Sequence, residues 1–133
     1  MKKSTKIILS IFIIAFVLIF LTVKIIMSQV ESNLNALLNA EIKEINLNSI
    51  EDGKYFGSYE VVPIAVEVFV TVSDHQISKI EIVEHENGQG TPAEAIIDRV
   101  IENQSLEVDV IAGATYSSKV ILKAIEDALD NAY

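Results

Sequence analysis

The sequence predicts a small α+β domain that follows a single N-terminal transmembrane helix. Three observations predict this fold class. The chain opens with an uncharged apolar stretch long enough to cross a bilayer, its middle alternates between apolar and polar residues, and its last third carries apolar residues at helical spacing. We therefore expect a small antiparallel sheet covered by two helices. Of the 133 residues, about a hundred remain for this domain, enough for one small core.

The first expected element is the apolar segment from Ile7 to Met27, in which Lys24 is the only charged residue. A spanning helix needs roughly 20 apolar residues, and a lysine near its end can extend its ammonium group to the interface. The alternative is a cleaved signal peptide that begins with Lys2, Lys3 and Lys6. The apolar run is longer than the core of a typical signal peptide, and no small-x-small pair follows it. A retained anchor over residues 1–27 is therefore favoured.

Charge predicts the orientation of this anchor. Three lysines precede the apolar segment, whereas all 19 acidic residues and six basic residues follow Met27, which leaves that part with a net charge of about −13. Because positively charged flanks stay in the cytoplasm, we expect a single-pass cell-membrane protein with a cytoplasmic N-terminus and an extracytoplasmic domain. The acidic balance argues against a nucleic-acid partner and against tight contact with anionic lipid. Solubility explains it most simply.

The absence of cysteine narrows the chemistry. It excludes a lipoprotein anchor, a disulfide framework, an iron–sulfur cluster, a thiolate metal site and a covalent haem motif. No metal site is expected. If the protein carries out redox chemistry, an organic cofactor must supply it.

Residues 28–50 are expected to form a polar helix or a stalk. Leucines and isoleucines between Leu34 and Ile45 fall near helical spacing, but three asparagines weaken the pattern. We interpret this segment as a spacer that holds the domain, residues 51–133, away from the membrane.

Three strands are expected at the start of the domain. The first is the aromatic segment Lys54–Tyr59, and the second is Ile64–Ser73. A hairpin turn over Ser73–Gln76 leads to the third strand, Ile77–His85, and a polar loop over Asn87–Thr91 follows. The second strand alternates most clearly, and its inward face should carry Ile64, Val66, Val68, Val70 and Val72.

Two amphipathic helices complete the expected fold. The first begins near Pro92, where a missing N–H costs nothing, and continues to about Gln104. The second extends from about Ser118 to Asn131. The sequence leaves open a short fourth strand near Asp109, between the two helices.

The segment from Asp109 to Ser118 has the composition of a phosphate site. It combines a tight glycine-containing turn, three aliphatic hydroxyl side chains and the start of a helix, whose free N–H groups and partial positive charge attract phosphate. Gly113 allows the backbone to approach a ligand, and Ser117 or Ser118 can cap the helix. The same residues also fit an ordinary capped turn, so the pattern alone leaves both interpretations open.

The order of residues in this segment, Asp109-Val-Ile-Ala-Gly-Ala-Thr115, resembles the flavinylation motif of the FMN-binding domain family, Asp-x-x-(Ser/Thr)-Gly-Ala-Thr. That domain occurs in the C subunit of the sodium-pumping NADH:quinone reductase and in the G subunit of Rnf complexes. The resemblance continues from about Asp52 to Leu129, with Asp-Gly-x-Tyr-x-Gly at its start. One position departs from the motif, because Ala112 stands where the family usually has Ser or Thr.

The resemblance implies that FMN is joined through its phosphate to Thr115. It also implies a partner, a flavin transferase that uses FAD as donor, releases AMP and reads the carboxylate of Asp109. His85 is a weaker candidate for a place near the flavin ring, and an exposed strand-end histidine is its alternative. The expected cofactor site further includes Gly113, Ala114, Tyr116, Ser117 and Ser118.

The function that the resemblance implies is electron transfer. The domain would take electrons from a membrane donor and pass them to an extracytoplasmic acceptor. The sequence shows no substrate pocket, so no catalytic residue is assigned and the question of an enzyme of its own stays open. Two alternatives remain: a non-covalent FMN-binding module for sensing or delivery, which the departure at Ala112 favours, and a flavin-free membrane-anchored interaction domain.

Overall fold

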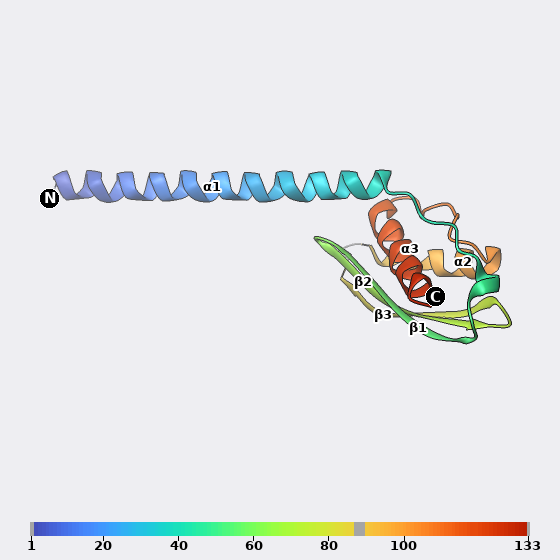
Figure 1. Cartoon of the computed structure of the whole chain (residues 1–133). Coiled ribbons are helices and arrows are strands. Elements are labelled where there is room, and N and C mark those ends of the chain that lie inside the picture. Colours follow the sequence, from blue (N-terminus) through green and yellow to red (C-terminus); the bar gives the residue numbers. More distant parts are fainter. Residues whose placement is uncertain (1, 87–89, 133) are drawn as a thin grey trace. The chain divides into compact units, whose positions relative to one another are not determined.

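A computed structural model describes residues 2–86 and 90–132, and side chains from residue 6 onward (Figure 1). The chain forms two compact units, Met1–Ser32 and Asn33–Tyr133. Part of the loop expected over Asn87–Thr91 lies outside the described residues. The helices and strands are α1 (Lys2–Asn39), η1 (Leu47–Ser49), β1 (Gly53–Val61), β2 (Ile64–Ser73), β3 (Gln76–Glu86), η2 (Thr91–Ala95), α2 (Ile96–Asn103) and α3 (Thr115–Asp130).

The first unit consists of the apolar part of α1. The large apolar side chains between Ile7 and Met27 are all exposed, and α1 is long and apolar enough to cross a membrane by length and composition. No glycine or proline interrupts the sequence before residue 53. The apolar segment and the polar residues after it therefore form one helix that ends at Asn39.

The second unit contains a three-stranded antiparallel sheet in the order β1-β2-β3. The predicted inward face of β2 is confirmed, since Ile64, Val66, Val68, Val70 and Val72 are all nearly inaccessible to solvent. The turn predicted between β2 and β3 is also confirmed, with positive φ at Asp74 and His75. The structure thus has the α+β class that the alternating pattern predicted.

The helices α2 and α3 lie on one side of the sheet, as Figure 1 shows. α3 packs against β1 and β2, and α2 packs against β3, so that the core lies between the helices and the inner face of the sheet. None of the described strands includes Asp109, and the residues from 107 to 111 are irregular. The short strand left open there does not form; instead, the carbonyl groups of Asp109 and Val110 accept hydrogen bonds from Arg99 on α2.

A helix approaches the sheet closely at Gly57, in the middle of β1. A Cβ atom on Gly57 would lie 2.2 Å from the carbonyl oxygen of Ala124 and 2.3 Å from the nitrogen of Ala128. The backbone of α3 therefore rests directly on the backbone of β1, and only glycine leaves room for this contact.

The second half of the predicted stalk packs onto the domain. Leu37 and Ile50 are buried in the core. Lys119 Nζ donates to the Ala40 carbonyl (3.0 Å), and Lys123 Nζ donates to the Glu41 carbonyl (2.7 Å). The compact unit consequently begins at Asn33, inside the segment predicted as a spacer, because these apolar and polar contacts hold the segment against α3.

Candidate functional site

A tight turn leads directly into α3. The Ala114 N–H donates to the Ile111 carbonyl (3.0 Å), and Gly113 has a φ of 79°. A residue other than glycine is strained in this conformation. The turn is braced from the helix, because the buried Ser118 hydroxyl accepts a hydrogen bond from the Ile111 N–H (3.0 Å).

The helix starts at Thr115, three residues earlier than predicted. Ala114 occupies the N-cap position, makes no side-chain cap hydrogen bond, and its carbonyl accepts the first helical bond from the Ser118 N–H (2.9 Å). The prediction that Ser117 or Ser118 caps the helix is wrong. Both side chains are buried within the first turn, and the Ser118 hydroxyl is bound to Ile111.

This arrangement fits the phosphate of a nucleotide-like cofactor. The N–H groups of the first helical turn have no intrahelical acceptor, and here no side chain caps them. Such groups, together with the helix dipole, bind phosphate. Ala112 and Gly113 are exposed, and among the described residues no atom beyond the chain neighbours of Gly113 lies within 4 Å of where its Cβ would be. Thr115 is half-buried, is the first residue of this helix and follows directly on the turn.

Arg99 on α2 holds the other end of this segment. Its Nη1 atom donates to the carbonyl of Asp109 (2.7 Å) and, at 3.4 Å, to that of Val110. The Asp109 side chain stays exposed. Arg99 was not predicted as part of the site, although it is the only lysine or arginine between Lys79 and Lys119 and such an isolated cation in an acidic domain suggests a specific partner.

A groove of about 610 Å³ lies beside the first turns of α3. One wall is the end of α1 and the residues after it, and the other wall is the irregular segment before the turn. Its lining consists of Leu38, Asn39, Ala40, Glu41, Ile42, Leu106, Glu107, Val108, Asp109, Val110, Lys119 and Leu122.

The profile of the FMN-binding domain family matches residues 64–130, which include β2, β3, the turn and α3. The chain belongs to the FMN-binding domain family. An NADH:acrylate oxidoreductase of Vibrio harveyi is 32% identical to it over 106 residues, which cover 76% of this chain and 11% of that protein. The chain thus spans a small part of this relative's length. The cofactor of this FMN-binding domain is FMN.

His85 occupies an inner position of the FMN-binding domain rather than an exposed strand end. It lies opposite Val66 in the sheet, its side chain is only 4% exposed, and its Nδ1 atom lies 2.9 Å from Glu94 Oε1. The exposed alternative is therefore wrong. The bond ties β3 to η2, and η2 packs against α3. His85 thus belongs to the scaffold that positions the helix.

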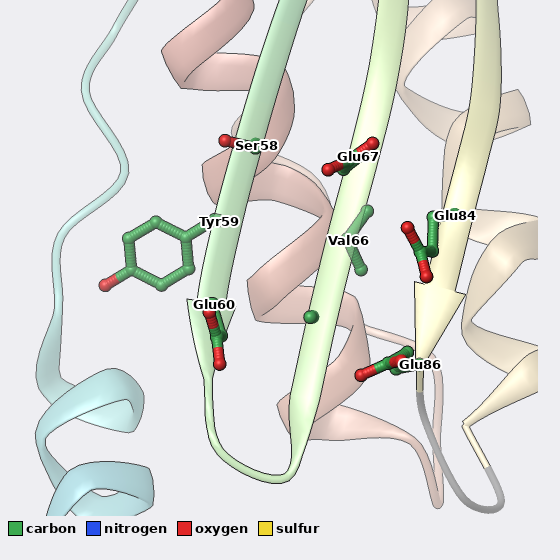
Figure 2. A pocket seen from close by; sticks show the side chains of 8 residues that line it. Ser58, Tyr59, Glu60, Val66, Glu67, Glu84 and Glu86 are labelled. Carbon is green, nitrogen blue, oxygen red and sulfur yellow. The ribbon is translucent and has the colours of Figure 1, made fainter.

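A smaller, strongly acidic hollow of about 230 Å³ lies over the end of the sheet that carries the turn between β1 and β2 (Figure 2). Four of its lining residues are glutamates, and Glu67 lies directly opposite Glu84 in the register. Within residues 2–86 and 90–132, no ion pair neutralises any of these four. The negative glutamate carboxylates would repel the negative phosphate of FMN, so this hollow does not suit the cofactor of the domain. The four carboxylates are those of Glu60, Glu67, Glu84 and Glu86.

The other end of the same sheet carries paired charges. The Lys54 ammonium lies 4.5 Å from the centre of the Phe69 ring and 2.8 Å from the Glu81 carboxylate, which also pairs with Lys79 (2.9 Å). Hydrogen bonds from Lys54 and then Lys79 lower the pKa of Glu81 to about 2. Lysines thus neutralise Glu81, whereas no ion pair among the described residues neutralises the four glutamates of the hollow.

Proposed function

We propose that the protein is a membrane-anchored extracytoplasmic electron carrier whose FMN is joined through its phosphate to the hydroxyl of Thr115. One observation carries the proposal: Thr115 is the first residue of a helix that has no side-chain cap and follows directly on a turn with a positive-φ glycine. In this proposal the Thr115 oxygen carries the phosphate, and the free N–H groups of the first helical turn bind it. A phosphodiester formed there keeps a negative charge, which these groups stabilise.

The attachment reaction belongs to the partner flavin transferase, with FAD as donor. The Thr115 oxygen attacks the phosphorus on the flavin side of FAD, the bond between the two phosphates breaks, AMP leaves, and the hydroxyl proton is released. The domain has to present the segment in a fixed shape. Arg99 holds the carbonyl of Asp109, and Ser118 holds the N–H of Ile111, so that both ends of the motif are braced.

The other residues of the turn have distinct roles in this proposal. Gly113 supplies the backbone conformation, and Ala114 leaves the helix end uncapped. Tyr116 is 37% exposed beside the acceptor, where its ring can contact the flavin. Ser117 and Ser118 anchor the first turn through their burial. Ala112 is exposed, so the alanine at this position, where the family usually has Ser or Thr, changes the surface of the domain and not its core.

The protein's place in an electron-transfer chain is inferred from its family. A bound flavin accepts and donates electrons, and the chain supplies position, electrostatics and a tether. We propose a membrane donor and an extracytoplasmic acceptor as partners, in keeping with the resemblance to domains of multisubunit reductases. The relative's name pairs NADH with acrylate, which makes a reducible small molecule a candidate for the final electron acceptor of such a chain.

The carboxylate of Asp109 should be required for flavin attachment but not for folding. Asp109→Ala removes an exposed side chain while the carbonyl bound by Arg99 remains. We therefore expect an unchanged melting temperature and a large loss of covalent flavin when the variant is co-expressed with a transferase. Intact mass and in-gel flavin fluorescence measure the loss. Glu102→Ala, an exposed acidic residue on α2, is the control, and full loading of Asp109→Ala would leave Asp109 without this role.

The orientation of the anchor can be tested in whole cells. Since three lysines precede the apolar segment and the acidic residues follow it, the domain should be outside the cytoplasm. Protease added to intact cells, after permeabilisation of any outer membrane, should then digest the domain and release fragments that contain Thr115. Digestion only after lysis of the inner membrane would contradict the proposed orientation.

Non-covalent FMN binding remains the second candidate because of Ala112. In that case the domain would lose its flavin on denaturation even after co-expression with an active transferase. Membership in the FMN-binding domain family argues against the flavin-free alternative.

A further inference from the structure

We propose that the outer face of the sheet, the face turned away from α3, is a docking surface for a basic amphipathic helix of a partner protein. The inference rests on the proposed function only where it assigns that helix to an electron-transfer partner, because an electron carrier has to bind its donor and its acceptor. Docking itself needs no flavin, so it can be measured on protein with or without the cofactor.

The residues of the outer face form four rows across the three strands, which follow from the pairing register. Starting at the turn between β1 and β2, the rows are Glu60–Ala65–Glu86, Ser58–Glu67–Glu84, Phe56–Phe69–Glu81 and Lys54–Thr71–Lys79. Glutamates therefore fill the two rows nearest this turn, an aromatic pair stands in the third row, and lysines stand in the last. The face is thus graded in charge along the strands.

No described element covers this face. The outward residues of β2 from Ala65 to Thr71 all stay partly accessible, whereas its five inward residues are buried. The helices α2 and α3 pack on the opposite side. Phe56 is 44% exposed, and its ring meets that of Phe69 edge to face at 5.4 Å between centroids. Aromatic side chains are enriched in the centres of protein interfaces, so this pair is suited to act as the apolar anchor.

A shift of register in β3 helps to build the acidic rows. Val83 is skipped in the pairing, because Ile82 lies opposite Val68 while Glu84 lies opposite Glu67. In a regular strand Glu84 would share the inner face with Ile82. The shift turns Glu84 outward and places it directly across from Glu67, where like charges destabilise a sheet. Such a local conflict is expected where the residues serve a function other than folding.

The charges of the face favour a basic protein as its occupant. The four glutamates of the hollow, which no ion pair among the described residues neutralises, would repel anionic lipid and nucleic acid. A second copy of this chain would bring two acidic surfaces together. Its lysines could not compensate well, because Lys54 and Lys79 already pair with Glu81. Lysine or arginine side chains of a partner complement the acidic rows and speed its approach.

The size of the face favours a single helix. Strands lie about 4.8 Å apart and rows about 7 Å apart, so the face is roughly 10 Å wide and 20 Å long. A helix of about 14 residues has these dimensions. Its basic residues would lie over the two acidic rows and an apolar residue over Phe56. A contact of this size is small, as is usual for electron-transfer complexes.

Two synthetic peptides test the surface. One is an amphipathic helix of about 14 residues with four lysines beside an apolar stripe, and the other has glutamate in place of each lysine. Full-length protein in nanodiscs of zwitterionic lipid is titrated with each labelled peptide, and fluorescence anisotropy is recorded at several salt concentrations. We expect only the lysine peptide to bind, with an affinity that falls as salt rises. Equal binding of the two peptides would overturn the proposal.

Variants of matched charge locate the binding. Glu67→Gln combined with Glu84→Gln should weaken the lysine peptide about five-fold and reduce its salt dependence, while the melting temperature stays equal or rises because a repulsion is removed. Asp98→Asn combined with Glu102→Gln removes the same charge from exposed positions of α2 and should leave the affinity within about two-fold. Phe56→Ser should weaken binding without changing the salt dependence, since the aromatic anchor carries no charge.

The other outcomes are equally decisive. Equal losses in the two double variants would assign binding to the overall charge of the domain and overturn the docking surface. A dimer of the full chain that dissociates on Phe56→Ser would assign the face to a second copy and overturn the basic partner. Protein that binds the lysine peptide yet carries no flavin after co-expression with a transferase would contradict the proposed function and leave the docking surface intact. Flavin-loaded protein that fails to distinguish the peptides would do the reverse.

Discussion

Thr115→Val is expected to abolish covalent flavin completely and to leave the domain folded. Valine keeps the shape and the β-branching of threonine but lacks the nucleophilic hydroxyl. Thr115 is half-buried at the first position of α3, where the substitution should change the free energy of unfolding by no more than about 0.5 kcal/mol. The denatured gel band should lose its flavin fluorescence, and the intact mass should equal that of the unmodified chain.

Two further variants test which hydroxyl group can accept the flavin. Thr115→Ser should retain some attachment, because a primary hydroxyl can still form the phosphoester. Ser117→Ala should retain the flavin, because the Ser117 side chain is buried and cannot present an acceptor. A fluorescent Thr115→Val band would place the flavin on another residue.

Gly57→Ala should cause a large loss of stability. The new methyl group would meet the backbone of α3 at 2.2–2.7 Å from Ala124 and Ala128, and a helix backbone cannot move aside as a flexible side chain can. Overpacking costs about 1–3 kcal/mol and occasionally more. We expect a value near 3 kcal/mol, which for a domain of about a hundred residues lowers the melting temperature by roughly 12–24 °C.

Gly53→Ala is the matched control in the same strand. Its methyl group would meet the ring of Tyr55 at 3.1 Å, and a side chain can yield by a few tenths of an ångström. Thermal unfolding followed by circular dichroism compares the two variants. Equal melting temperatures would show that α3 does not rest on β1 at Gly57 in solution.

The sequence pattern predicted the sheet well because burial in a strand is encoded locally. In β2 each residue's face follows from its parity, and all five expected inward residues are buried. The two helices were also predictable, since their apolar stripes repeat at helical spacing. The acceptor turn could be located because its glycine and hydroxyl residues are contiguous.

The hydrogen bonds that hold the segments of the site in place could not be predicted, because they join residues that are distant in sequence. Arg99 reaches the Asp109 carbonyl from another helix, and Lys119 reaches Ala40 across 79 positions. The start of α3 was misplaced for a different reason. Serine is a common helix cap, so the pattern favoured Ser117 or Ser118, whereas the helix begins after an alanine with no capping side chain.

The contacts of residues 33–50 with α3 have a practical meaning for work on the isolated domain. The family profile begins at residue 64, but a fragment cut there would lack β1, and one cut at residue 51 would lose Leu37 and Ile50 from the core. It would also expose the nearly buried pair of Lys123 and Glu126, whose neighbours include Glu41 and Lys43. A soluble fragment meant to keep its native packing should therefore start no later than Asn33.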